Sequence, residues 1–284
     1  MTDFLPNEIA TPIRMPSTAN LMIDSSDRSG ATTSPWNFQI TKNQALMNGF
    51  FTRIATTEVV LDWFEPNVVT GSNIFTIRNT GTTTKYSVTL TQGSYTVKDC
   101  LDSIVTRLNA ATTGITFSIV GVGANCALHG TAAFSVTSTD NSGNPVALAF
   151  NLGMITDVST TDAYLFSPDL RPYKYIDFIS PQLTYNQTVK DASSDTYDKL
   201  VLCRWYFAWD TPPTLDAYGF PILMGYTEFS CRRVFNPPKQ IAWKNSQPIG
   251  NLGFQVIGNG FNTPLSGTPS VSSGWQMTLQ VSEV

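Results

Sequence analysis

Residues 275–282, WQMTLQVS, alternate apolar and polar side chains without interruption. Successive side chains of a β-strand point to opposite faces, so this pattern predicts a strand with one buried and one polar face. Residues 200–209 show the same signal, because every second residue from Val201 to Trp209 is apolar. Strand patterns bounded by turn residues recur elsewhere along the chain, at residues 21–24, 36–40, 51–64, 175–179, 226–235 and 253–257. Together these stretches predict an antiparallel β-sandwich.

The middle of the chain, residues 66–165, has a different pattern. Apolar residues from Val97 to Leu108 recur at helical spacing and form one stripe, with Thr96 placed as the N-cap and Asp99 as its capping-box partner. Short strand patterns lie before and after this helix, at residues 75–77, 86–90, 115–120, 133–137 and 146–151. This order predicts a small α+β unit of the type β-β-α-β-β with a core of its own.

The three strands before the middle unit and the five after it come to eight, which is the number in a jelly roll. We therefore expect a mainly β fold: a single eight-stranded jelly roll formed by residues 20–65 and 166–284, with residues 66–165 as an inserted small α+β (β-β-α-β-β) domain. Insertion into a loop whose two ends lie close together disturbs a fold little. Residues 1–19 contain three prolines and predict an extended N-terminal arm.

Charged residues make up 13% of the chain, against about 25% in typical globular proteins. The formal net charge is −4 and the sequence has no Lys/Arg block, so we expect no direct contact with nucleic acid. No apolar run reaches the roughly 20 residues of a membrane-spanning helix, and the first residues do not resemble a signal peptide. We expect synthesis in the cytoplasm and no membrane span. The four cysteines form no C-x-x-C pair and are interpreted as reduced core residues.

Hydrolytic and redox chemistry depends most often on histidine, cysteine or paired carboxylates. The chain has one histidine, His129, which we interpret as an ordinary loop residue rather than as part of a triad or a zinc site. The sequence has no G-x-S-x-G, P-loop or Rossmann glycine pattern. We therefore expect no enzymatic activity, no catalytic residue, no metal and no cofactor.

Asp24, Asp27 and Arg28 share one turn and form the first candidate contact site between subunits. Three charged residues so close together fit a calcium site or a contact with a neighbouring subunit. An Asx-turn braced by a local ion pair is the favoured interpretation, because no D-x-D-x-D-G pattern is present.

Arg232 and Arg233, with Lys239 and Lys244, form the densest basic cluster. Alternation places Arg232 and Arg233 on opposite faces of a strand, which does not fit a stripe that binds nucleic acid. A charge contact between subunits, or a salt bridge to a nearby carboxylate, is the favoured interpretation for these two residues.

Six short motifs occur in order along the chain: LMIDSSDR at 21–28, SPWNFQI at 34–40, QGSYT at 92–96, LG at 152–153, RRVFNPPK at 232–239 and PIGNL at 248–252. They resemble motifs of penton (minor capsid) proteins from virophages, polinton-like viruses and related large DNA viruses of protists. The resemblance implies a jelly roll whose five copies fill each vertex of an icosahedral virion, contacting the major capsid protein, with the inserted domain pointing outward.

Two functions therefore remain open. The first is a homopentameric vertex protein of a virion, made in the cytoplasm of a host cell. The second is a viral attachment protein that binds a carbohydrate or another host receptor through the inserted domain.

Overall fold

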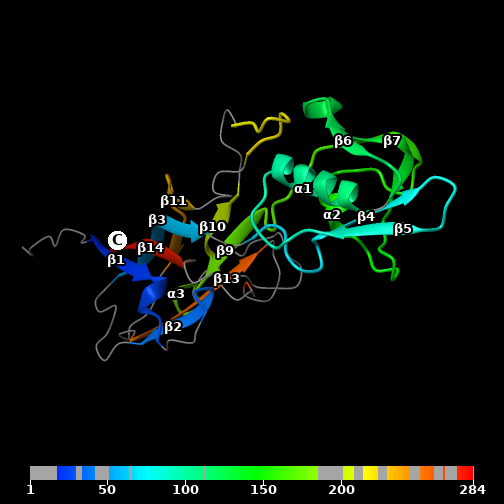
Figure 1. Ribbon diagram of the computed structural model, residues 1–284. Helices are drawn as coiled ribbons and strands as arrows, with labels where there is room; N and C mark the ends of the chain where they lie inside the picture. The colour runs from blue at the N-terminus through cyan, green and yellow to red at the C-terminus, as the bar shows by residue number, and fades with distance from the viewer. Residues whose placement is uncertain are drawn as a thin grey trace, which may run out of the picture.

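The computed structural model of the protein describes residues 18–29, 34–41, 51–63, 66–111, 113–184, 201–207, 214–222, 229–242, 250–258, 265 and 274–283. This part is mainly β-structure, arranged in three sheets (Figure 1). Of the expected N-terminal arm, residues 1–17 lie outside the described part. Thr18 and Ala19 already belong to the first strand, β1 (Thr18–Asp24).

Two antiparallel sheets enclose one core and take their strands from both ends of the chain. The first sheet has the order β1-β14-β3-β11, with β12 also paired to β3; its further strands are β3 (Arg53–Trp63), β11 (Phe229–Val234), β12 (Gln240–Ala242) and β14 (Gly274–Ser282). The second sheet has the order β10-β9-β13-β2, formed by β2 (Asn37–Thr41), β9 (Tyr175–Ile179), β10 (Val201–Tyr206) and β13 (Asn251–Gly258). Within the sandwich, the chain changes sheet at every connection except those from β9 to β10 and from β11 to β12, which is consistent with a jelly roll.

The two sheets hold five and four strands in the described part of the chain, one more than the eight expected. The additional strand is β12, which pairs with β3 opposite residues 53–55, while β11 pairs with β3 opposite residues 58–63. Pro237 and Pro238 lie between the two, and proline cannot donate a hydrogen bond to a β-ladder. The edge of the first sheet is therefore divided into two short strands.

Trp275 lies at the centre of the sandwich core. Its ring centroid is 5.4 Å from that of Phe38, 5.2 Å from Phe178 and 5.5 Å from Phe254. Its indole N–H donates a hydrogen bond of 2.8 Å to the carbonyl of Pro35. The predicted inward face of residues 275–282 is confirmed, because the alternate residues of this strand are also buried: Met277, Leu279 and Val281.

A third sheet lies beside the sandwich (Figure 1). Its order is β5-β4-β7-β6, with β8 also paired to β7; the strands are β4 (Ile74–Asn79), β5 (Lys85–Thr89), β6 (Phe117–Val120), β7 (Ala127–Val136) and β8 (Thr160–Tyr164). This sheet and its helices, called the third-sheet unit below, have a hydrophobic core separate from that of the sandwich.

The predicted helix of the middle segment is confirmed as α1 (Val97–Ala110). The hydroxyl of Thr96 accepts a hydrogen bond of 3.1 Å from the backbone N–H of Asp99 and donates one of 2.7 Å to its carboxylate. This reciprocal pair is the expected variant of a capping box. The predicted apolar stripe faces the core, with Val97, Cys100, Leu101, Ile104 and Leu108 buried.

The strand predicted at residues 146–151 is wrong, because this segment forms the short helix α2 (Ala147–Asn151). Its sequence, ALAFN, contains Ala and Leu, which favour helices. An apolar run this short does not distinguish a helix from a strand by its periodicity. Gly153 ends the helix at a φ of 67°, where a Cβ would lie 1.9 Å from the carbonyl oxygen of Phe166. The unit therefore has the order β4-β5-α1-β6-β7-α2-β8 rather than β-β-α-β-β.

Residues 214–222, called the strap below, leave the sandwich between β10 and β11 and pack against the third-sheet unit. Phe220 is buried in the core of that unit, and Leu170 joins the same core; both lie outside the range 66–165 expected for it. The backbone N–H of Gly123, in the short 3-10 helix η2 (Gly123–Asn125), donates a hydrogen bond of 2.7 Å to the carbonyl of Tyr218. The strap thus connects two parts of the fold.

Candidate assembly interface

The outer face of the first sheet carries a shallow groove of about 290 Å³. Residues of three neighbouring strands and of the 3-10 helix η1 (Ser25–Asp27) line it, among them Met22, Asp24, Asp27, Glu58, Val60, Gln276 and Thr278. Met22 is 79% exposed, which is unusual for a large apolar side chain in a strand. The groove therefore combines apolar and acidic groups at the β1 edge of the sandwich.

Asp24 forms the predicted Asx-turn. Its carboxylate accepts a hydrogen bond of 2.7 Å from the backbone N–H of Ser26 and another of 2.7 Å from the amide of Gln276. The predicted local ion pair is wrong, because none of the ion pairs within the described residues joins Arg28 to Asp24 or Asp27.

Arg28 instead bonds to the backbone. Its Nη1 donates a hydrogen bond of 2.9 Å to the carbonyl of Ser25. Within the described part of the chain, its buried Nε has no hydrogen-bond partner. Buried donors are normally satisfied, so this nitrogen is an exception within the described residues.

Arg232 forms the predicted salt bridge, and its partner is Glu58. The two are joined by two parallel hydrogen bonds, Nε to Oε1 at 2.6 Å and Nη2 to Oε2 at 2.9 Å. The hydrogen bond from Arg232 lowers the pKa of the Glu58 carboxyl below its ordinary value of 4.5. Glu58 also lines the groove, so Arg232, Asp24 and Asp27 belong to the same outer face.

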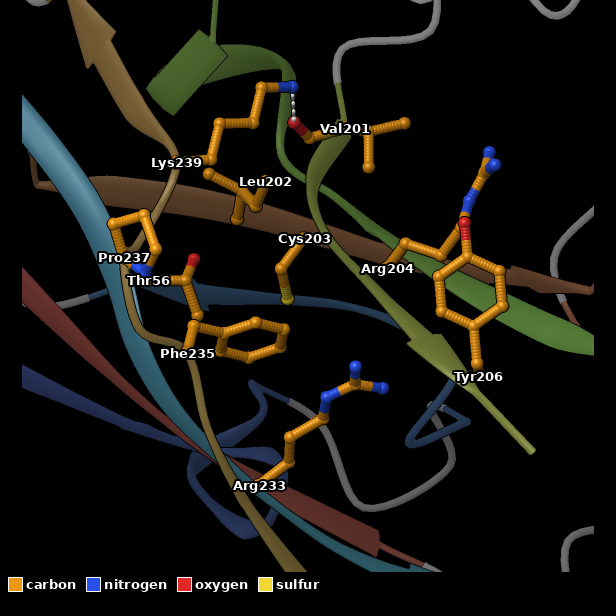
Figure 2. A pocket seen from close by; sticks show the side chains of 10 residues that line it. All are labelled: Thr56, Val201, Leu202, Cys203, Arg204, Tyr206, Arg233, Phe235, Pro237 and Lys239. Atoms are coloured by element: carbon orange, nitrogen blue, oxygen red, sulfur yellow. Dashed lines mark hydrogen bonds between the residues drawn. The ribbon is translucent and has the colours of Figure 1, made fainter. Parts of the chain in front are cut away.

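Arg233 points to the other side of the strand, and the prediction of opposite faces is confirmed. It lines a cleft of about 530 Å³ between β10 and β11, the edge strands of the two sheets (Figure 2). Its guanidinium carbon lies 5.5 Å from the ring centroid of Phe235 and 6.0 Å from that of Tyr206. The remaining lining residues are Thr56, Val201, Leu202, Cys203, Arg204, Pro237 and Lys239. The structure does not bring Arg233 together with the other four predicted residues.

Sequence reasoning missed Arg204, the second arginine of this cleft. Its guanidinium donates hydrogen bonds of 2.6 and 3.0 Å to the fully buried carboxylate of Asp177 and stacks 4.1 Å from the ring centroid of Tyr175. One signal could have identified this pair: each of two apolar strands carries one charged residue, Asp177 in β9 and Arg204 in β10, and the two charges are opposite. Lys239 donates a hydrogen bond of 3.0 Å to the carbonyl of Val201, while Lys244 lies outside the described residues.

His129 lies on β7 rather than in a loop, which corrects the prediction. Its Nδ1 is 2.8 Å from a carboxylate oxygen of Asp162, and this bond lowers the pKa of Asp162 below its ordinary value of 3.8. Ser118 lies opposite His129 in the pairing of β6 and β7, yet no hydrogen bond joins the two among the described residues. A histidine and a carboxylate without an activated nucleophile do not form a catalytic triad.

The described residues form neither a metal-ligand cluster nor a membrane-spanning helix. They contain no group of three His, Cys, Asp or Glu side chains arranged to hold a metal ion. None of their helices is long and apolar enough to cross a bilayer.

Comparison with protein-family models and with curated proteins gives no match. Among solved structures, the crystal structure of the mavirus penton protein resembles this chain with a TM-score of 0.50 and 11% identity, over 95% of this chain and 100% of that one. A chain of the Sputnik virophage, solved by cryo-electron microscopy, gives a TM-score of 0.45 and 12% identity over 93% of this chain and 98% of that one. At such low identity the first likeness establishes the fold alone, and no argument rests on the second. The chain thus shares the fold of the mavirus penton protein over nearly its whole length.

Proposed function

We propose that this protein is a structural capsid protein that forms the pentameric vertex, or penton, of an icosahedral virion. The observation that supports this most directly is the fold shared with the mavirus penton protein, because the alignment leaves no part of that protein unmatched. In this proposal the protein has no enzymatic activity, makes no direct contact with nucleic acid, contacts the major capsid protein, and is made in the cytoplasm of the host cell.

The strand order supports the proposed organisation of a jelly roll with an inserted domain. Counting β11 and β12 as two parts of one edge strand, the sandwich has the eight strand positions of a jelly roll. The separate core of the third-sheet unit supports an inserted domain at residues 66–165. Of the arm proposed at residues 1–19, the last two residues belong to β1.

The arrangement of charge supports assembly into a ring. A ring requires a head-to-tail contact in which two different surfaces of the subunit meet. Asp24 and Asp27 lie at the β1 edge of the first sheet, and Arg233 lies at its β11 edge. We propose that Arg28 gains its missing hydrogen-bond partner in such a contact between subunits. Arg232 contacts the neighbouring subunit in the same way.

Quantitative mass spectrometry of purified virions tests the proposal. A vertex protein is expected at a small and constant ratio to the dominant coat protein, and antibodies against this chain should label vertices in electron micrographs. Labelling spread evenly over the facets, or absence from purified particles, would contradict a vertex role.

A specific observation favours the attachment protein as a second candidate. The third-sheet unit exposes several large apolar side chains to between 45% and 60%: Phe150, Ile155, Val158, Tyr164 and Phe166. Such residues are common where a protein binds a partner. Binding of the full chain to a glycan array, lost in Tyr164→Ala and Phe166→Ala but kept in Tyr206→Ala, is expected only for the second function.

A further inference from the structure

The cleft between β10 and β11 opens at an edge of the sandwich where both sheets end. β10 is the last strand of the second sheet and β11 is the last strand of the first. In the described part of the chain, each of them therefore has one side of its backbone without a partner strand. Exposed edges of this kind accept extended peptides. The volume of 530 Å³ lies in the range of ordinary binding sites.

The chemistry of the cleft favours a peptide that carries both apolar and acidic side chains. Apolar and aromatic groups form much of its lining, among them Leu202, Phe235 and Pro237. Two of its three cations are engaged, Arg204 with Asp177 and Lys239 with a backbone carbonyl.

Arg233 differs from these two cations. No carboxylate within the described residues lies at ion-pair distance from it. Figure 2 shows its side chain entering the cleft from β11, opposite Cys203 on β10. Its charge is held between two aromatic rings and is available to an incoming carboxylate.

Residues 1–17, MTDFLPNEIATPIRMPS, match these requirements in sequence. Each of its two acidic residues is followed directly by apolar ones, Asp3 by Phe4 and Leu5 and Glu8 by Ile9, while Arg14 is the single basic residue. Prolines at positions 6, 12 and 16 disfavour a helix and suit an extended peptide.

The arm begins at the edge of the first sheet opposite to the cleft. Thr18 starts β1, which is separated from β11 by β14 and β3, or about 14 Å at ordinary strand spacing. A head-to-tail ring brings two different surfaces of neighbouring subunits together, and the β1 edge and the β10 and β11 edges are two surfaces that can meet in this way. We propose that residues 1–17 of one copy bind in the cleft between β10 and β11 of the neighbouring copy, with a carboxylate of the arm paired to Arg233. This inference rests on the proposed ring.

A binding measurement tests the contact without the ring. A fluorescent peptide of residues 1–17 is titrated against the chain that lacks these residues, and saturable binding is expected. Arg233→Glu should weaken it at least tenfold, and so should a peptide with Asp3→Lys and Glu8→Lys. Arg107→Glu, the same charge change on the exposed side of α1, should leave binding unchanged. Arg233→Gln gives a second variant with a smaller disturbance. Absence of binding, or equal binding by every variant, would overturn the inference.

A cross-link then distinguishes the neighbour from the same chain. The full chain carrying Phe4→Cys and Pro237→Cys is oxidised and separated without reductant. A ladder of covalent oligomers is expected, whereas a cross-linked monomer, or no cross-link at all, would overturn binding to the neighbour. The mass of the chain without residues 1–17 is independent of this outcome. A pentamer of that truncated chain, together with absent peptide binding, would overturn the inference and support the proposed vertex.

Discussion

The carboxylate of Asp216 accepts a hydrogen bond of 3.0 Å from the backbone N–H of Lys98, 118 positions earlier in the chain. Lys98 lies in the first turn of α1, where backbone N–H groups have no partner inside the helix. The strap thus supplies a second cap to the helix of the third-sheet unit. The same carboxylate accepts bonds from the backbone of Tyr218 and Phe220, at 2.9 and 3.0 Å, which fix the shape of the strap.

Replacing this carboxylate should loosen the end of α1. Asp216→Ala removes a negatively charged cap, a change that typically costs about 0.5–2 kcal/mol. We expect faster amide hydrogen exchange at Lys98 and its neighbours. The control Asp140→Ala removes a carboxylate that bonds only within its own turn, to Ser142 and Asn144, and should leave exchange at Lys98 unchanged. Equal protection of α1 in both variants would mean that the strap does not hold the helix.

The deletion of residues 66–165 tests the separation of the two cores. We expect the remaining chain to fold as a sandwich, but Phe220 would lose its buried surroundings. Adding Tyr218→Ser and Phe220→Ser to the deletion should therefore increase the yield of soluble protein. The same two changes in the full chain are the control, and they should destabilise the third-sheet unit instead. No soluble product from either deletion would contradict an independent sandwich.

Burial of three cysteines predicts that the stability of the folded protein depends on pH. Desolvation raises the pKa of Cys100 and of Cys203 to about 12 and that of Cys126 to about 11, from 9.0. Because the pKa of each thiol is higher in the folded state than in the unfolded state, the thiols of the unfolded chain ionise first as the pH rises. The free energy of unfolding therefore has its full thiol contribution below about pH 9 and decreases above it. The midpoint of denaturant unfolding, measured from pH 7 to 11, should fall over this range.

Alkylation provides the matching chemical test. At pH 8 the native protein should react with iodoacetamide at the partly exposed Cys231, while the three buried thiols react only after unfolding. Mass spectrometry of the two samples separates the sites. Rapid native modification of Cys100 or Cys203 would show that these cores open readily.

The contribution of Trp275 to the sandwich can be measured directly. Trp275→Ala removes the ring that contacts Phe38, Phe178 and Phe254, and should destabilise the protein by about 3–5 kcal/mol in denaturant unfolding. Met22→Ala, on the outer face, should change stability by no more than about 0.5 kcal/mol. Similar values for both variants would contradict a core centred on Trp275.

Regular patterns explain which parts of the fold could be predicted. The alternation around Trp275 and the stripe of α1 are periodic, and burial of one face follows directly from such periodicity. The strap has no period, and its contacts join residues more than a hundred positions apart, so no local signal reveals them. For Arg204 and Asp177, the single charges in two apolar strands suggest a pair, but their direct pairing depends on the register of β9 and β10. Alternation along one strand was enough to predict opposite faces for Arg232 and Arg233. The cleft beside Arg233 could not be predicted in this way, because strands of both sheets form it.

The mass of the assembled full chain tests the proposed vertex most directly. Native mass spectrometry of the purified protein should give a particle of five times the 31.1 kDa chain, and Arg233→Glu should shift it toward the monomer. A stable trimer, which is typical of fibre-like attachment proteins, would contradict the account.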